Sequence, residues 1–140
     1  MKIYLCSTEP EEKTHKWVSN VAVLNGCVED SEATSIICDG FLSSFVYNEL
    51  EDVLKKIVSK MRLGAELIII NSDIKMLFQR IRNEEIDTPT LNSILFKHGP
   101  LKSLSSAGEL CELMPENLQV THKHFDAITS SVTIKAKRIR

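Results

Sequence analysis

The sequence has no apolar run long enough to cross a membrane. One of its longest runs, residues 67–70, has four residues, whereas a membrane-spanning helix needs about 20. The amino-terminal segment turns polar after the first few residues and lacks the apolar core of a secretory signal. An excess of one charge is also absent, because 17 basic residues stand against 19 acidic ones. A net charge of −2 gives no global attraction to nucleic acid or to an anionic membrane. We therefore expect a cytoplasmic protein that binds neither nucleic acid nor a membrane.

Cysteine pairs with metal-binding spacing are absent as well. The four cysteines form no Cys-x-x-Cys pair, and no histidine stands in zinc-finger register with them. Cys6 and Cys38 lie in strand-like runs, where free cysteine behaves as a small buried hydrophobic residue. His122 and His124 would share one face of a strand and could pair on a metal, but the lysine between them favours a solvated face. The sequence predicts structural thiols and no metal site, with a reactive or bridged cysteine as the alternative.

The 140 residues are 43% hydrophobic and contain no repeat, which predicts one domain over residues 1–140. Strands are expected at residues 3–6, 17–24, 34–38 and 65–70, and the polar residues 7–16 are expected to form a loop or a helical turn. The dipeptide Asn25-Gly26 is expected to end the second strand. The continuously apolar run 65–70 is typical of a strand covered on both faces.

The clearest helix covers residues 50–61, where apolar side chains recur at i, i+3, i+4, i+7, i+8 and i+11. Gly64 is expected to form its C-cap. Three shorter helices are expected: one over residues 74–81 capped by Ser72 or Asp73, one opened by Thr88-Pro89, and one from a capping box of Ser106 and Glu109 to Pro115.

The end of the chain changes its hydrophobic period. Residues 118–122 and 132–136 alternate between apolar and polar side chains, which predicts an antiparallel strand pair at a sheet edge. Strands and helices that alternate first and end in such a pair are typical of an α/β domain. We therefore predict a Rossmann-like, doubly wound and mostly parallel sheet with a C-terminal antiparallel strand pair.

Residues 30–77 resemble the middle of a small class I S-adenosylmethionine-dependent methyltransferase of the kind found beside glycan genes. In that family a helix leads through a Leu-Lys-Pro-Gly-Gly turn into an apolar strand. Residues 48–57 match the helix, and residues 61–73 resemble the turn and strand, with Ala65 in place of the second glycine. Residues 133–138 resemble the family's closing strand. The resemblance covers about two thirds of the chain and implies a shortened version of the fold, with one strand missing.

The segments that hold the cofactor in this family differ here. The family's first strand runs into a Gly-x-Gly loop, where this chain has Cys6, Ser7 and Thr8. Glycine is needed there because it allows a positive φ and lets the cofactor approach a bare backbone. A Trp-x-Asn-x-Asp segment follows in the family, and its acid holds the ribose. Residues 17–22 stand in its place and end in alanine.

If the pocket is retained, the resemblance implies a cofactor site built from residues at the strand ends: Cys6, Ser7, Thr8, Asn20, Asp39 and Gly40. No catalytic residue is assigned, because methyl transfer depends chiefly on aligning the nucleophile with the methyl group. Asp39-Gly40 also fits a turn that closes a strand. Trp17 fits a residue that stacks on an adenine or sugar ring, or one that lies in the core or at a partly buried edge. His98 fits either the lining of an acceptor pocket or a tight turn. The basic segment 135–140 favours solubility over nucleic-acid binding.

Three functions remain open. We expect a methyltransferase-like domain that has lost efficient S-adenosylmethionine binding and acts as a binding or assembly module, as a homo-oligomer or with a protein partner. The alternative is an active S-adenosylmethionine-dependent methyltransferase with a small-molecule or glycan acceptor. A third hypothesis is another nucleotide or sugar ligand at the same strand ends. S-adenosylmethionine is thus the cofactor in question, and its efficient binding is not expected.

Overall fold

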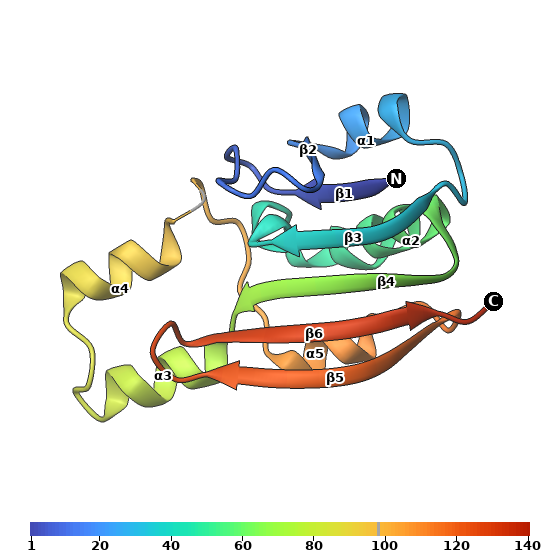
Figure 1. Cartoon of the computed structure of the whole chain (residues 1–140). Coiled ribbons are helices and arrows are strands. Elements are labelled where there is room, and N and C mark those ends of the chain that lie inside the picture. Colours follow the sequence, from blue (N-terminus) through green and yellow to red (C-terminus); the bar gives the residue numbers. More distant parts are fainter. Residues whose placement is uncertain (98) are drawn as a thin grey trace.

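The computed structural model describes residues 1–97 and 99–140, so the interpretation of His98 falls outside the described residues. Six strands of this part form one sheet in the order β2-β1-β3-β4-β6-β5 (Figure 1). The strands are β1 (Lys2–Leu5), β2 (Lys16–Val18), β3 (Ala33–Asp39), β4 (Met61–Ser72), β5 (Leu118–Asp126) and β6 (Ser131–Arg138).

The first four strands are parallel, whereas β6 pairs antiparallel with both β4 and β5. The chain winds outwards in both directions from the boundary between β1 and β3, because β2 lies on one side and β4 on the other. The predicted Rossmann-like, doubly wound sheet with a C-terminal antiparallel pair is confirmed. In such sheets ligands bind beyond the carboxyl ends of the strands, near this reversal.

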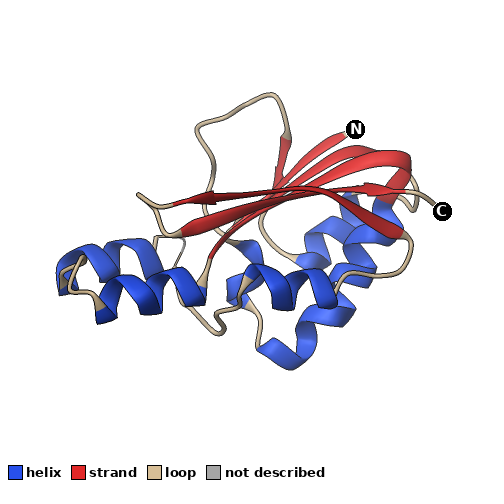
Figure 2. Ribbon diagram, turned by 90° about the horizontal axis from the view of Figure 1, so that it is seen from below, coloured by secondary structure: helices blue, strands red, loops and turns tan. Residues whose placement is uncertain are grey.

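The helices lie on one side of the sheet, and the loop between β1 and β2 passes over the other side (Figure 2). They are α1 (Val21–Cys27), α2 (Leu50–Lys60), α3 (Ile74–Arg82), α4 (Thr88–Leu95) and α5 (Ala107–Glu112), with short 3-10 turns η1 (Phe41–Ser44) and η2 (Tyr47–Glu49) before α2. No helix among the described residues is long and apolar enough to span a bilayer.

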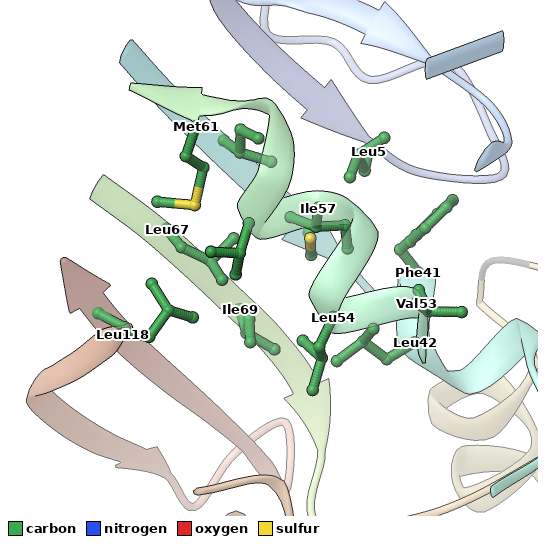
Figure 3. Close-up of a cluster of buried hydrophobic side chains, with 14 of the residues drawn as sticks. Leu5, Phe41, Leu42, Val53, Leu54, Ile57, Met61, Leu67, Ile69 and Leu118 are labelled. Atoms are coloured by element: carbon green, nitrogen blue, oxygen red, sulfur yellow. The ribbon is translucent and has the colours of Figure 1, made fainter. Parts of the chain in front are cut away.

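The core lies between the sheet and α2 (Figure 3). Leu54 and Ile57 of α2 are fully buried on the side of the helix that faces the sheet. Leu67 and Ile69 of β4 are fully buried in the same cluster. Each such side chain contributes about 1.5–3 kcal/mol when it leaves water. The opposite side chains of β4 are only half-buried. The expectation that residues 65–70 are covered on both faces is therefore wrong, because helices cover one face alone.

The second expected strand is shorter than predicted. It ends at Val18, and residues 21–27 form α1 instead of continuing the strand to Leu24. Asn20 starts this helix, since its Oδ1 accepts a 2.8 Å hydrogen bond from the Val23 amide. The helix places Leu24 in the core at zero exposure. The dipeptide Asn25-Gly26 therefore lies within the last turn of α1 and is not the turn that ends a strand.

Gly64 also has a different place. α2 ends at Lys60, and β4 begins at the next residue, so Gly64 lies inside the strand and not at a helix C-cap. Its φ is +83°, a conformation that residues with a Cβ rarely adopt. The pairing of β4 with β3 shifts register between the partners of Ala33 and Ser35. Gly64 therefore fits an irregularity of the strand.

The remaining expected elements are confirmed. Residues 7–15 form a loop. Asp73 caps α3, and Pro89 lies in the first turn of α4. Ser106 and Glu109 form both hydrogen bonds of the capping box at α5. Local side-chain chemistry fixes each of these helix starts, which is why sequence spacing located them.

Candidate functional site

The carboxyl ends of the parallel strands meet along one edge of the sheet. Cys6, Ser7 and Thr8 directly follow β1, Asn20 stands two residues after β2, and Asp39-Gly40 ends β3. β1 is hydrogen-bonded between β2 and β3. The fold therefore brings all of the expected site residues to the same edge.

The segment after β1 is built from residues with side chains. Cys6 is 2% exposed, and its Sγ lies 3.7 Å from the Thr8 Oγ1. Its carbonyl accepts a 2.9 Å hydrogen bond from the Trp17 Nε1. No residue of this segment, 6–15, is among the described residues with a positive φ, and β2 begins directly after it without a helix. The segment thus differs from a tight glycine turn that opens a helix.

The side chain that follows β2 at this edge is the amide of Asn20. The Asn20 Oδ1 is engaged as the N-cap of α1, and the first turn of that helix has no acidic residue. A neutral cap side chain offers a nearby ligand its amide group, whereas a carboxylate would accept hydrogen bonds from two hydroxyls at once.

The end of β3 is joined to β1 by a polar contact. The Tyr4 hydroxyl donates a 2.6 Å hydrogen bond to the Asp39 Oδ2. Burial and this contact with Asp39 raise the pKa of the Tyr4 hydroxyl well above its usual range. Gly40 follows with a φ of +63°, and its amide donates a 2.8 Å hydrogen bond to the Ile70 carbonyl. Asp39-Gly40 thus forms the turn that closes β3.

A cleft of about 460 Å³ opens beside this turn. Asp39 and Gly40 line it, together with Lys97 near α4 and with His124 and Asp126 of β5. A volume of several hundred Å³ is typical of small-molecule sites. Sequence reasoning missed Lys97 and Asp126 because the cleft joins segments far apart in the chain. The alternating pattern that placed His124 on a strand was the available signal.

Cys6 and Cys38 are buried and Cys27 and Cys111 half-buried, and none of these four cysteines forms a disulfide. Burial and then the nearby Asp39 raise the pKa of the Cys38 thiol, which makes it a poor nucleophile at neutral pH. His122 and His124 lie exposed on one face of β5, opposite Lys135 and Thr133. Within the described residues, no group of three or more metal-ligating side chains gathers.

Trp17 is 39% exposed on the edge strand β2. Its indole nitrogen is already bonded to the Cys6 carbonyl. Trp17 therefore lies at a partly buried edge, and the alternative expectation of a core position is wrong because β2 is an edge strand.

No family model and no curated protein matches the sequence. The fold, in contrast, matches those of solved structures. A Thermotoga maritima protein described as an S-adenosylmethionine-dependent methyltransferase, possibly acting on histamine, matches with a TM-score of 0.53 at 18% identity, over 80% of this chain and 59% of that one. The 1,6-didemethyltoxoflavin-N1-methyltransferase of Burkholderia thailandensis was solved with S-adenosylhomocysteine. It matches with a TM-score of 0.62 at 13% identity, over 99% of this chain and 61% of that one. The N-methyltransferase NodS of Bradyrhizobium japonicum was also solved with S-adenosylhomocysteine. It matches with a TM-score of 0.59 at 8% identity, over 99% of this chain and 66% of that one.

These similarities show the fold, which is that of the class I S-adenosylmethionine-dependent methyltransferases. The chain spans less than two thirds of the length of the first two of these proteins, 59% and 61%. A shared fold at such low identity does not transfer an activity.

Proposed function

We propose that the chain is a methyltransferase-fold domain that has lost efficient S-adenosylmethionine binding and serves as a binding or assembly module. The observation that carries this proposal is the segment after β1. It contains Cys6, Ser7 and Thr8 where a bare backbone would admit the cofactor, and it continues as a loop to β2.

Physical reasons link this segment to a loss of affinity. A Cβ at each position occupies space that a glycine backbone leaves to the ligand. The missing helix removes the backbone amides and the partial positive charge that a helix N-terminus presents. Ser7 and Thr8 can each offer a single hydroxyl, which does not replace that arrangement.

The end of β2 supports the same proposal. Asn20 has no charge, and its Oδ1 is committed to the Val23 amide at 2.8 Å. A ribose at this edge would therefore find no carboxylate at the end of β2 to accept hydrogen bonds from both of its hydroxyls. The residues of this edge do not fit S-adenosylmethionine.

Calorimetric titration of the full chain with S-adenosylhomocysteine tests the proposal. We expect no saturable heat up to millimolar ligand and little change in the melting temperature. A retained site would behave otherwise, since ligand at 100 times its dissociation constant stabilises by about 2.7 kcal/mol, which raises the melting temperature by several degrees. Asn20→Asp is the matched variant, because it keeps the cap and supplies a carboxylate. Saturable micromolar binding by the wild-type chain would overturn the proposal in favour of the active methyltransferase. Binding gained only in Asn20→Asp would support it, because the missing carboxylate would then account for part of the lost affinity.

A second candidate function is suggested by the cleft beside Asp39. Its lining combines hydroxyls, such as that of Thr133, with both charges, from Lys97 and Asp126. Such a lining suits a hydroxylated small molecule, for example a sugar or a nucleotide. Thermal shift with a nucleotide sugar and with free glucose tests this candidate. A shift that disappears in His124→Ala would support it, and the absence of any shift at millimolar concentrations would contradict it.

A further inference from the structure

The floor of the cleft beside Asp39 is one row of side chains that crosses four strands. In the register of the sheet, Asp39 of β3 pairs with Ile70 of β4, and Ile70 pairs with Thr133 of β6. Thr133 in turn pairs with His124 of β5. All four residues line the cleft, and we call them the floor row. They lie on the face of the sheet away from the helices, because alternate residues such as Ile69 are buried in the core.

The floor row makes the cleft elongated. Adjacent strands lie about 4.8 Å apart, so the three steps from β3 to β5 give a floor roughly 14 Å long. α4 lies beyond the ends of β3 and β4 (Figure 1), and its residues Ser93 and Ile94 also line the cleft. A floor of this length exceeds a single sugar ring, so it suits a ligand of two or more linked units.

Hydroxyl groups make up much of the polar lining. Five lining residues carry one, namely Ser72, Ser93, Thr129, Ser131 and Thr133. A hydroxyl can donate and accept hydrogen bonds, so it matches ligand hydroxyls in either role. Among the described residues of the lining, none is Phe, Tyr or Trp, the side chains on which nucleobases usually stack. The lining therefore favours a saccharide over a nucleotide.

Carboxylates lie near both ends of the floor row, and local hydrogen bonds orient them. At β3, the Asp39 Oδ2 accepts the 2.6 Å hydrogen bond from the Tyr4 hydroxyl. At the end of β5, the Asp126 Oδ1 accepts hydrogen bonds of 2.9 and 3.3 Å from the Ile128 and Thr129 amides. A carboxylate has about four lone-pair sites on its two oxygens, which suits the adjacent hydroxyls of a sugar ring.

The charge balance of the cleft disfavours phosphate. Among the described lining residues, the carboxylates of Asp39 and Asp126 are opposed by the single ammonium group of Lys97. A phosphate monoester carries a charge of about −1.5 to −2 at pH 7. It would enter a lining with more acids than lysines, whereas an uncharged ligand would meet no such repulsion.

We infer that the cleft binds an uncharged saccharide of at least two sugar units, laid along the floor row from Asp39 to His124. The inference rests on the second candidate function, which it narrows from sugars and nucleotides to neutral saccharides. It does not depend on the cofactor segment, because the floor row begins at β3 whereas that segment follows β1.

An immobilised panel of neutral di- to tetrasaccharides, with matched members that carry phosphate or sialic acid, tests the inference on the full chain. Calorimetric titration then measures the members that bind. We expect neutral members to bind about tenfold more tightly than their acidic counterparts, and more tightly than the corresponding monosaccharides. Binding to no neutral member, or equal or tighter binding to the acidic members, would overturn the inference.

Thr133→Val removes the hydroxyl from the middle of the floor row and keeps the branched shape of the side chain. We expect it to weaken the neutral saccharide about fivefold, which is the usual effect of one hydrogen bond. The matched control is Thr121→Val, the same exchange on β5 outside the described lining, which should leave the affinity unchanged. Circular dichroism establishes that both variants are folded. Equal losses in the two variants would overturn the placement of the ligand.

Asp126→Asn tests the charge argument. Asparagine keeps an oxygen for the Ile128 and Thr129 amides but removes the negative charge. We expect weaker binding of the neutral saccharide and a smaller difference between it and its phosphorylated counterpart. An unchanged difference would refute the role of this carboxylate in disfavouring phosphate.

Nucleotide sugars separate this inference from the function on which it rests. Binding of a nucleotide sugar without any neutral saccharide would refute the inference and keep a small-molecule function for the cleft. Binding of neither would refute both. Titration with S-adenosylhomocysteine bears on the loss of cofactor binding alone.

Discussion

The Tyr4 hydroxyl donates a 2.6 Å hydrogen bond to the Asp39 Oδ2 and so joins the middle of β1 to the end of β3. The Tyr4 and His15 rings also pack in a T-shaped arrangement, with 6.4 Å between their centroids. His15 belongs to the loop that crosses the face of the sheet opposite the helices. Tyr4 thus links two strands and the loop at the edge that carries the candidate site residues.

Tyr4→Phe is expected to lower the free energy of unfolding by about 1 kcal/mol at pH 7, which is the usual net value of a hydrogen bond. Burial and Asp39 raise the pKa of Tyr4 in the folded protein above the unfolded value of about 10. The folded state therefore holds the phenol proton more tightly, and this contribution is present below pH 10 and lost as the pH rises further.

Urea unfolding between pH 7 and pH 11 measures both effects. Wild type should lose stability above pH 10 more steeply than Tyr4→Phe, because the other titrating groups are common to both proteins. Equal slopes would show that the Tyr4 hydroxyl does not contribute to the alkaline loss.

Asn20→Ala is expected to cost about 1 kcal/mol, since it removes the side-chain acceptor at the start of α1. Asn20→Asp keeps that acceptor and adds a charge that the helix N-terminus favours, so its stability should match wild type within about 0.5 kcal/mol. Urea unfolding at pH 7 compares the three proteins. A similar loss in both variants would mean that the amide group, and not the Oδ1 acceptor, is required.

Much of the fold follows from local patterns in the sequence. The spacing of apolar residues locates α2, and cap chemistry locates the starts of α3 and α5. The strand expected over residues 17–24 is wrong in its second half because valines favour strands, while the cap at Asn20 and the burial of Leu24 decide in favour of a helix. Gly64 is misplaced for a related reason. An apolar residue at Met61 fits the end of a helix as well as the start of a strand, and the structure begins β4 there, so Gly64 cannot cap the helix.

The candidate site is less accessible to sequence reasoning. Asp39 and Gly40 can be placed because they end a strand, and the ends of parallel strands share one edge. Lys97, His124 and Asp126 reach the same cleft from segments that only the three-dimensional fold brings together. The uncovered face of the sheet could not be foreseen either, because half-buried isoleucines such as those at 68 and 70 look the same in sequence as buried ones.

The four cysteines are expected to react at two different rates. Cys6 and Cys38 are buried, and burial raises the pKa of the Cys38 thiol, so neither should react with an aromatic disulfide reagent in the folded protein. Cys27 and Cys111 are half-buried and should react first. Counting released thiolate by absorbance should give two equivalents in buffer and four in denaturant. A third fast equivalent would show that one of the buried thiols is accessible.

Asp73 is expected to be the most sensitive polar residue of the fold. It is 2% exposed, and its Oδ1 accepts hydrogen bonds of 2.9 and 3.0 Å from the Lys75 and Met76 amides. Its Oδ2 accepts a 2.9 Å bond from the Ala107 amide. One carboxylate therefore fixes the starts of both α3 and α5. Asp73→Ala removes three hydrogen bonds and should cost about 3 kcal/mol.

Asp73→Asn distinguishes the charge and the second oxygen from the shape of the side chain. The asparagine amide has one oxygen, so it can accept hydrogen bonds from the start of α3 or from the Ala107 N–H of α5, but not from both. Its NH₂ group then faces the other N–H donor, and a loss of about 1–2 kcal/mol in unfolding free energy is expected. The matched control is Asp87→Asn at the exposed cap of α4, where a single acceptor bonds the Thr90 amide. That variant should change the stability by at most about 0.5 kcal/mol. Equal losses in the two asparagine variants, measured by urea unfolding, would contradict a special role for the carboxylate that α3 and α5 share.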